Sequence, residues 1–140
     1  MAETHGAPPA DRLPWWLMAM VVIGASLMAM GGVIALVRPA MLVSASDEIN
    51  GAVHVYAGYL VARNLALAVM LLFMLAIRAR AALSSLMVLT ALIQLLDAGV
   101  DFMEGRWTLV PGVLVFAMAY FVGAARLSGR PWWSTAAWRD

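Results

Sequence analysis

Long apolar stretches separated by short polar links run along most of the chain. Four of these stretches are close to the ~20 residues that a helix needs to cross the hydrocarbon core of a bilayer. We expect spans at about 14–37, 52–77, 82–103 and 108–125. A helix satisfies its own backbone hydrogen bonds where lipid offers no partner, so the pattern predicts an all-α integral membrane protein.

The links between the spans predict the topology. The links "RARA" and "EGRW" are short, so the last three spans should be sequential neighbours in a four-transmembrane-helix antiparallel bundle over 14–126. The link "RPAMLVSASDEING" is long enough for a short interfacial helix or cap. Residues 1–13 should form a flexible N-terminal tail and residues 127–140 a cytoplasmic C-terminal tail. A cleaved signal peptide is the alternative for the first span, but its apolar region is long for one, and we expect it to be retained.

The basic residues predict the orientation of the bundle. All nine are arginine, and six of them fall on the side of the two termini: Arg12, Arg78, Arg80, Arg126, Arg130 and Arg139. Arg38 and Arg106 fall on the other side, and Arg63 lies within a span. By the positive-inside rule, we expect both termini to be cytoplasmic. Tryptophans near both ends of the bundle fit the headgroup zones.

Composition excludes several classes of protein. Hydrophobic residues make up 64% of the chain and charged residues 12%, against about a quarter charged in soluble domains. A net charge of +1 provides no basic patch for nucleic acid. With no cysteine and two histidines, neither a thiolate nor a zinc site is expected, and no nucleotide-binding motif occurs. We therefore predict no metal and no cofactor.

Polar side chains on the third span fall on one face, within and beside the stretch "QLLDAGVDFMEG". At about 100° per residue, these positions lie within a wedge of roughly 80°. They are Thr90, Gln94, Asp97, Asp101 and Glu104. The rest of the span is apolar and ionisable groups are costly in lipid, so this face should point into the bundle.

The second span carries a matching polar face in "YAGYLVARN". Tyr56, Tyr59 and Arg63 share this face, because residues three, four and seven apart stack along a helix, and Asn64 lies at its side. Arg63 and Asp97 lie at depths that the long guanidinium side chain can bridge. We predict that the two faces meet in an Arg63–Asp97 ion pair, with Tyr59, Asn64 and a glutamine of the third span as hydrogen-bond partners.

The segments "YLVARNLALAVMLLFML" and "LTALIQLLDAGVDFMEG", joined by a tight arginine turn, resemble the small four-span bacterial membrane proteins of the DoxX-like kind. The resemblance covers about half of the chain and depends on Arg63, Asn64 and Asp97, which match polar positions that those proteins often carry. It implies a four-helix bundle in the inner membrane. It implies no particular reaction.

A purely structural clasp, in which one arginine pairs with one carboxylate to fasten two helices, needs a single carboxylate. The two polar faces carry more polar groups than that, so a ligand pocket is favoured over a clasp. We expect an outer-half polar pocket between the second and third spans, in a membrane-embedded binding protein or small enzyme that acts on a lipophilic small molecule. For proton-transfer chemistry such as isomerisation or epoxide opening, the candidate catalytic residues are Asp97, Asp101 and Tyr59. The candidate ligand-binding residues are Arg63, Asn64, Gln94 and Tyr56.

Two other functions fit the pattern. The chain would serve as a non-catalytic accessory subunit of a larger membrane complex if the Arg/Asp cluster is a structural clasp. A proton or ion pathway is less favoured, because the inner half of the bundle is nearly all apolar. Besides the lipid bilayer, the expected partners are a lipophilic small molecule, a second copy or another membrane protein. Glu104 is most simply a solvated charge or the partner of Arg106.

Overall fold

The computed structural model describes residues 13–41, 43 and 48–129. Within these residues the chain forms four α-helices and no strand: α1 (Trp15–Val37), α2 (Gly51–Ala76), α3 (Arg80–Met103) and α4 (Val110–Ser128). A 3-10 turn, η1 (Pro39–Met41), follows α1. Each α-helix is long and apolar enough to cross a membrane. The predicted all-α bundle of four spans is confirmed, and its composition is that of an integral membrane protein.

Local signals set the ends of the helices. Asn50 caps α2, since its side-chain oxygen accepts hydrogen bonds from the backbone N–H groups of Ala52 and Val53 at 3.0 and 3.3 Å. Gly129 ends α4 with a φ of +64°, the left-handed conformation that glycine adopts at low cost. The helices begin and end within three residues of the predicted spans. The predicted cap in the first link falls partly on η1, while residues 1–12 and 130–140 of the predicted tails lie outside the described residues.

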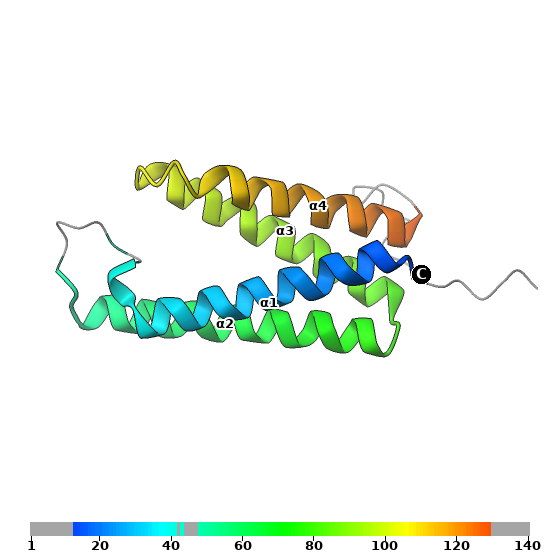
Figure 1. Cartoon of the computed structure of the whole chain (residues 1–140), viewed down its shortest axis with the longest axis horizontal. Coiled ribbons are helices and arrows are strands. Elements are labelled where there is room, and N and C mark those ends of the chain that lie inside the picture. Colours follow the sequence, from blue (N-terminus) through cyan, green and yellow to red (C-terminus); the bar gives the residue numbers. More distant parts are fainter. Residues whose placement is uncertain (1–12, 42, 44–47, 130–140) are drawn as a thin grey trace, which may run out of the picture.

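The helices pack as two antiparallel hairpins. Most interhelical contacts lie between α1 and α2 and between α3 and α4, whereas α2 and α3 share fewer and α1 and α4 very few. Figure 1 shows the α1–α2 hairpin and the α3–α4 hairpin as two layers. The start of α1 and the end of α4 lie at the same end of the bundle.

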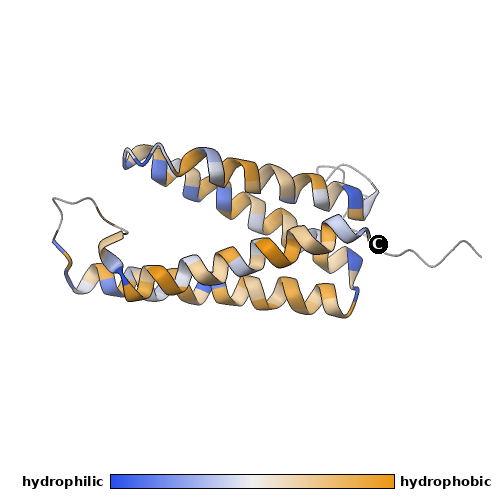
Figure 2. Cartoon of the chain, viewed as in Figure 1, coloured by the Kyte–Doolittle hydropathy of each residue, from blue (hydrophilic) through white to orange (hydrophobic). Residues whose placement is uncertain are grey.

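The helix surfaces are mostly hydrophobic, as Figure 2 shows. Large apolar side chains such as Val69 and Val115 are 62% and 68% exposed on the outside of the bundle. In water such a surface would drive association, but in a bilayer it faces hydrocarbon. The hydrophilic segments gather at the helix ends and on α3.

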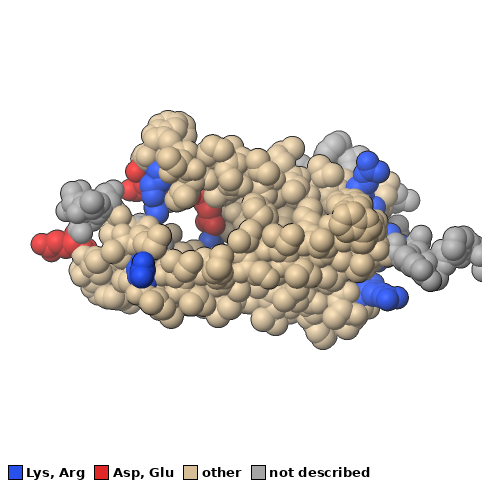
Figure 3. Space-filling model, viewed as in Figure 1, with Lys and Arg blue, Asp and Glu red and all other residues tan. Residues whose placement is uncertain are grey.

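The two hairpins diverge toward the end of the bundle that carries the link after α1 (Figure 1). We call this part the open half. Figure 3 shows an opening between the hairpins here, with acidic and basic side chains at its margins. Charged groups are thus concentrated where the bundle is least tightly packed.

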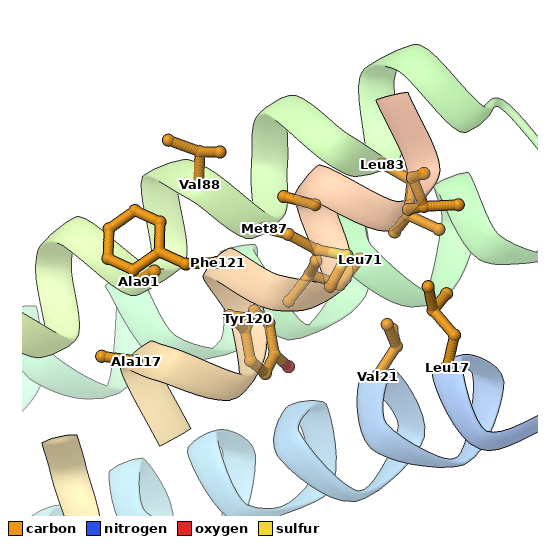
Figure 4. Packing of buried hydrophobic residues seen from close by; sticks show 12 residues of the cluster. Leu17, Val21, Leu71, Leu83, Met87, Val88, Ala91, Ala117, Tyr120 and Phe121 are labelled. Carbon is orange, nitrogen blue, oxygen red and sulfur yellow. The ribbon is translucent and has the colours of Figure 1, made fainter. Parts of the chain in front are cut away.

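The hydrophobic core lies in the opposite, packed half, near the turn between α2 and α3. Its side chains come from all four helices, and Figure 4 shows them converging. Leu17 of α1, Leu71 of α2 and Leu83 of α3 are fully buried there. Between α3 and α4, the buried Ser84 hydroxyl donates a hydrogen bond to the carbonyl oxygen of Ala124 at 3.0 Å. The packed half therefore holds the two hairpins together.

Candidate functional site

Arg63 and Asp97 form a bidentate ion pair between α2 and α3. Arg63 Nη1 donates to Asp97 Oδ1 at 3.2 Å, and Arg63 Nη2 donates to Asp97 Oδ2 at 2.8 Å. The planar guanidinium fits a carboxylate in this way, which adds orientation to the charge attraction. The predicted pair is confirmed. It also joins the two hairpins, because α2 belongs to one and α3 to the other.

Asn64 extends this polar cluster toward α1. Arg63 Nε donates to Asn64 Oδ1 at 3.4 Å, a long hydrogen bond that confirms Asn64 as a partner of the arginine. On the α1 side, a Cβ added at Gly32 would lie 3.4 Å from the Cβ of Asn64 and 3.1 Å from the Cα of Val61. Glycine at position 32 therefore lets α1 approach the part of α2 that carries Asn64.

A cavity of about 200 Å³ lies beside the ion pair and is lined by all four helices. Its polar lining comes from α2 and α3: Asn64, Thr90, Gln94 and Asp97. Its apolar lining comes from every helix, and includes Leu27 and Met28 of α1, Leu67 of α2, Ile93 of α3 and Phe116 of α4. The cavity thus combines polar side chains from α2 and α3 with apolar side chains from all four helices, a mixture found in small-molecule sites.

The polar side chains that line this cavity differ in how many hydrogen bonds they already make to other groups of the protein. Thr90 donates its hydroxyl to the carbonyl oxygen of Leu86 at 2.8 Å, within its own helix. Both carboxylate oxygens of Asp97 accept from Arg63. The Gln94 side chain makes no hydrogen bond within the described parts of the chain, so the predicted bond to the ion pair is not formed. Gln94 is therefore the polar lining residue most available to a ligand.

The two tyrosines of α2 lie away from the cavity. Tyr59 is 73% exposed and Tyr56 is 52% exposed. Tyr59 forms no hydrogen bond to the ion pair among the described residues, contrary to the expectation from helical spacing. Tyr56 instead lines a second hollow of about 480 Å³ in the open half, together with Glu104 and Arg106. Tyr56 therefore lies at a hollow that the end of α3 also lines, while Tyr59 lines neither this hollow nor the cavity.

Asp101 lies in a separate ion pair at the end of α3. Arg106 Nε lies 3.4 Å from Asp101 Oδ1, and the backbone N–H of Arg106 donates to the carbonyl oxygen of Asp101 at 2.8 Å. Arg106 thus pairs with Asp101 rather than with Glu104. This contact stabilises the turn between α3 and α4. Asp101 is not among the residues that line the cavity.

A buried contact between Tyr120 and Gly24 borders the cavity on its α1 side. Tyr120 is 2% exposed, and its hydroxyl has no hydrogen-bond partner among the described residues. The hydroxyl approaches Gly24, which itself lines the cavity. In Figure 4 the Tyr120 side chain projects from α4 toward α1. The small residues in "GASLMAMGG" indicate close packing of the first helix, but nothing in the sequence identifies tyrosine as the partner.

The fold and the site together define a class: an integral membrane four-helix bundle with an intramembrane ion pair beside a small polar cavity. The described residues contain no group of three or more potential metal ligands. No family model, curated protein or solved structure matches the chain. The DoxX-like resemblance therefore stays a prediction.

Proposed function

We propose that the protein binds a small, uncharged, lipophilic molecule in the cavity beside the Arg63–Asp97 pair. The observation that carries this proposal is the lining itself, which combines the amide groups of Asn64 and Gln94 with aliphatic and aromatic side chains. The volume of about 200 Å³ exceeds the roughly 150 Å³ that holds benzene in a protein core, yet lies below the usual range for drug-sized ligands. A single ring or a short polar end of a longer molecule fits this space.

The charges at the site favour a neutral ligand. Arg63 and Asp97 already balance each other, so an ion entering the cavity would be desolvated without a free counter-charge. The amide of Gln94 offers both a donor and an acceptor, and Asn64 adds a second amide. A hydroxyl, carbonyl or amide is therefore the polar function we expect in the ligand.

Binding has more support than catalysis at this site. An acid or base for isomerisation or epoxide opening needs a carboxyl group that reaches the ligand and can exchange a proton. Asp97 faces the cavity, but Arg63 engages both of its oxygens. Asp101 is paired with Arg106 in the turn, and Tyr59 is exposed on the outside. We therefore propose the catalytic form of the function only as secondary.

We further propose that the chain lies in the bacterial inner membrane with both termini in the cytoplasm. The uneven distribution of arginines supports this orientation. It places the open half toward the outer leaflet. Relationship to DoxX-like proteins is part of this proposal, and it is supported by the polar positions Arg63, Asn64 and Asp97.

A second candidate function is that of a non-catalytic accessory subunit. The observation that favours it is the Arg63–Asp97 pair itself, which joins α2 of one hairpin to α3 of the other. Such an ion pair would hold the two hairpins together whether or not a ligand binds. In this case, another membrane protein or a second copy would fill the open half.

Native mass spectrometry of the full chain released from detergent tests the proposed function. We expect the wild-type protein to retain one small molecule per chain. Gln94→Leu should lose it, because a free amide is replaced by an apolar side chain of similar size. Thr90→Val is the matched control and should retain it, since the Thr90 hydroxyl is already bonded within its own helix. A bare wild-type chain, or one that carries only bulk phospholipid, would favour the accessory subunit.

A further inference from the structure

A third hollow, which is apolar, lies between α1 and α4. This groove has a volume of about 350 Å³ and is lined by Trp15, Trp16, Ala19, Met20, Ile23, Val115, Phe116 and Ala119. Apart from the indole nitrogens, the lining side chains carry only hydrocarbon and thioether groups. It lies along the seam where α1 and α4 make few contacts. A groove on this seam opens sideways to the hydrocarbon of the bilayer.

The groove and the polar cavity meet at Phe116. This ring lines both of them, and no other residue does. Along α1 the groove is lined at positions 15–23 and the cavity from Gly24 to Met28, so the two hollows lie in succession along this helix. From Trp15 to Met28, thirteen steps of about 1.5 Å give a combined length of roughly 20 Å. The two hollows are therefore neighbours along α1, with Phe116 in the lining of both.

The polarity of the lining changes from the groove to the cavity. The groove begins at Trp15 and Trp16, whose side chains favour the membrane interface, and it continues as a purely apolar surface. The cavity, which begins about 12–14 Å further along α1 on the same helical rise, carries the amides of Asn64 and Gln94. Its polar end thus lies deep in the bilayer, where a phosphate or other charged headgroup would be too costly.

We propose that the ligand is an uncharged single-chain amphiphile that enters sideways from the bilayer. Its polar end lies in the cavity, and its hydrocarbon chain passes Phe116 and occupies the α1–α4 groove. The groove alone would accept any acyl chain, but a phospholipid cannot bring its headgroup to the cavity. The Tyr120 hydroxyl, which has no hydrogen-bond partner in the described part of the chain, packs on Gly24 close to this junction and lies near the expected path of the polar end. The proposal depends on the proposed function and adds the class and the pose of the ligand.

Photocrosslinking in phosphatidylcholine vesicles tests the pose with two probes. Both are long-chain primary alcohols with a diazirine, placed beside the hydroxyl in one and near the far end of the chain in the other. We expect the first to label peptides that contain residues 24–28 and 90–97, and the second to label residues 15–23 and 115–119. An excess of unmodified hexadecanol should reduce both signals several-fold, since a specific site is saturable.

Variants at the junction test the role of Phe116. Phe116→Trp should narrow the passage and reduce labelling of the groove by the far-end probe several-fold. Met118→Trp is the matched control, because Met118 lies two residues away on α4, is 59% exposed and lines neither hollow. It should leave the labelling unchanged. Equal effects of the two variants would overturn the passage at Phe116.

The outcomes separate this proposal from the proposed function. One outcome is that the first probe labels the cavity saturably while the second probe labels all outward faces of the bundle. This would overturn the placement of the hydrocarbon chain in the groove, but it would leave ligand binding in the cavity in place. If hexadecanol competes with neither probe, the single-chain class is overturned. The retained mass in native mass spectrometry then decides independently whether the cavity binds a different molecule.

Discussion

Tyr120 of α4 packs the edge of its ring directly on Gly24 of α1. A Cβ added at Gly24 would lie 2.8 Å from Tyr120 Cε2 and 2.9 Å from Tyr120 Cζ, and it would overlap the hydroxyl oxygen. Helices α1 and α4 make few other contacts. The Gly24–Tyr120 contact therefore limits how closely α1 and α4 approach each other at this point.

Gly24→Ala should destabilise the bundle for this reason. We expect the free energy of unfolding, measured by titration of mixed micelles with SDS, to fall by about 1–3 kcal/mol, the usual cost of overpacking. Gly31→Ala is the matched control: a Cβ there meets nothing within 4 Å, so a neutral or slightly stabilising effect is expected. Adding Tyr120→Phe to Gly24→Ala should restore part of the loss. Equal stability of the two alanine variants would contradict the close approach.

The Arg63–Asp97 pair should show coupling between its two side chains. Arg63→Met or Asp97→Leu alone leaves one charge without its partner, so each should destabilise more than the double variant does. We expect a coupling free energy of about 1–3 kcal/mol from a double-mutant cycle, below the value for fully buried pairs, because 36% and 39% of the two side chains is exposed. Arg106→Gln, which removes the longer pair in the turn, should cost less than about 1 kcal/mol. Strictly additive single variants would show that the pair does not stabilise the bundle.

Ser84 provides a hydrogen bond between α3 and α4 that can be tested against its neighbour. Ser84→Ala removes the 3.0 Å bond to the carbonyl oxygen of Ala124 and should lower stability by about 0.6–1.7 kcal/mol. Ser85→Ala removes a bond to Ala81 within the same helix and should have little effect. The comparison by SDS unfolding isolates the interhelical bond, and similar losses for both variants would argue against it.

The orientation can be tested by cysteine labelling, since the chain contains no cysteine of its own. Thr108 lies in the turn between α3 and α4, and Ala81 in the first turn of α3 at the opposite end; both are exposed. In spheroplasts, a membrane-impermeant maleimide should label Thr108→Cys directly and Ala81→Cys only after permeabilisation. The reverse pattern would place the termini outside.

The sequence predicts the spans and the ion pair for identifiable physical reasons. A helix that crosses hydrocarbon must be about 20 apolar residues long, so length and composition nearly determine where each span lies. Arg63 and Asp97 are expensive in lipid unless paired, and their helical faces and depths leave few alternatives. The role of Asn64 as a hydrogen-bond partner could be predicted because it is the next residue after Arg63 in the chain.

The composition of the cavity could not be predicted in the same way. It depends on where the hairpins part, and this depends on contacts between residues far apart in the chain, such as Gly24 with Tyr120 and Gly123 with Met20. Helical spacing places Tyr59 on the face of Arg63, but it contains no information about the divergence that leaves Tyr59 exposed. Asp101 pairs with Arg106 in the turn after α3 and does not line the cavity.

The pairing of Arg63 with Asp97 has a consequence for biogenesis. Arg63 is at the middle of the 26-residue helix α2, where an unpaired arginine raises the cost of insertion by about 2.5–3.5 kcal/mol on translocon scales. Its counter-charge is on α3, which the ribosome makes later. The first hairpin is therefore inserted less stably in the membrane until α3 of the second hairpin has been made. A nascent chain that stops before Asp97 leaves the Arg63 guanidinium unpaired, which exposes the chain to the proteases of membrane quality control.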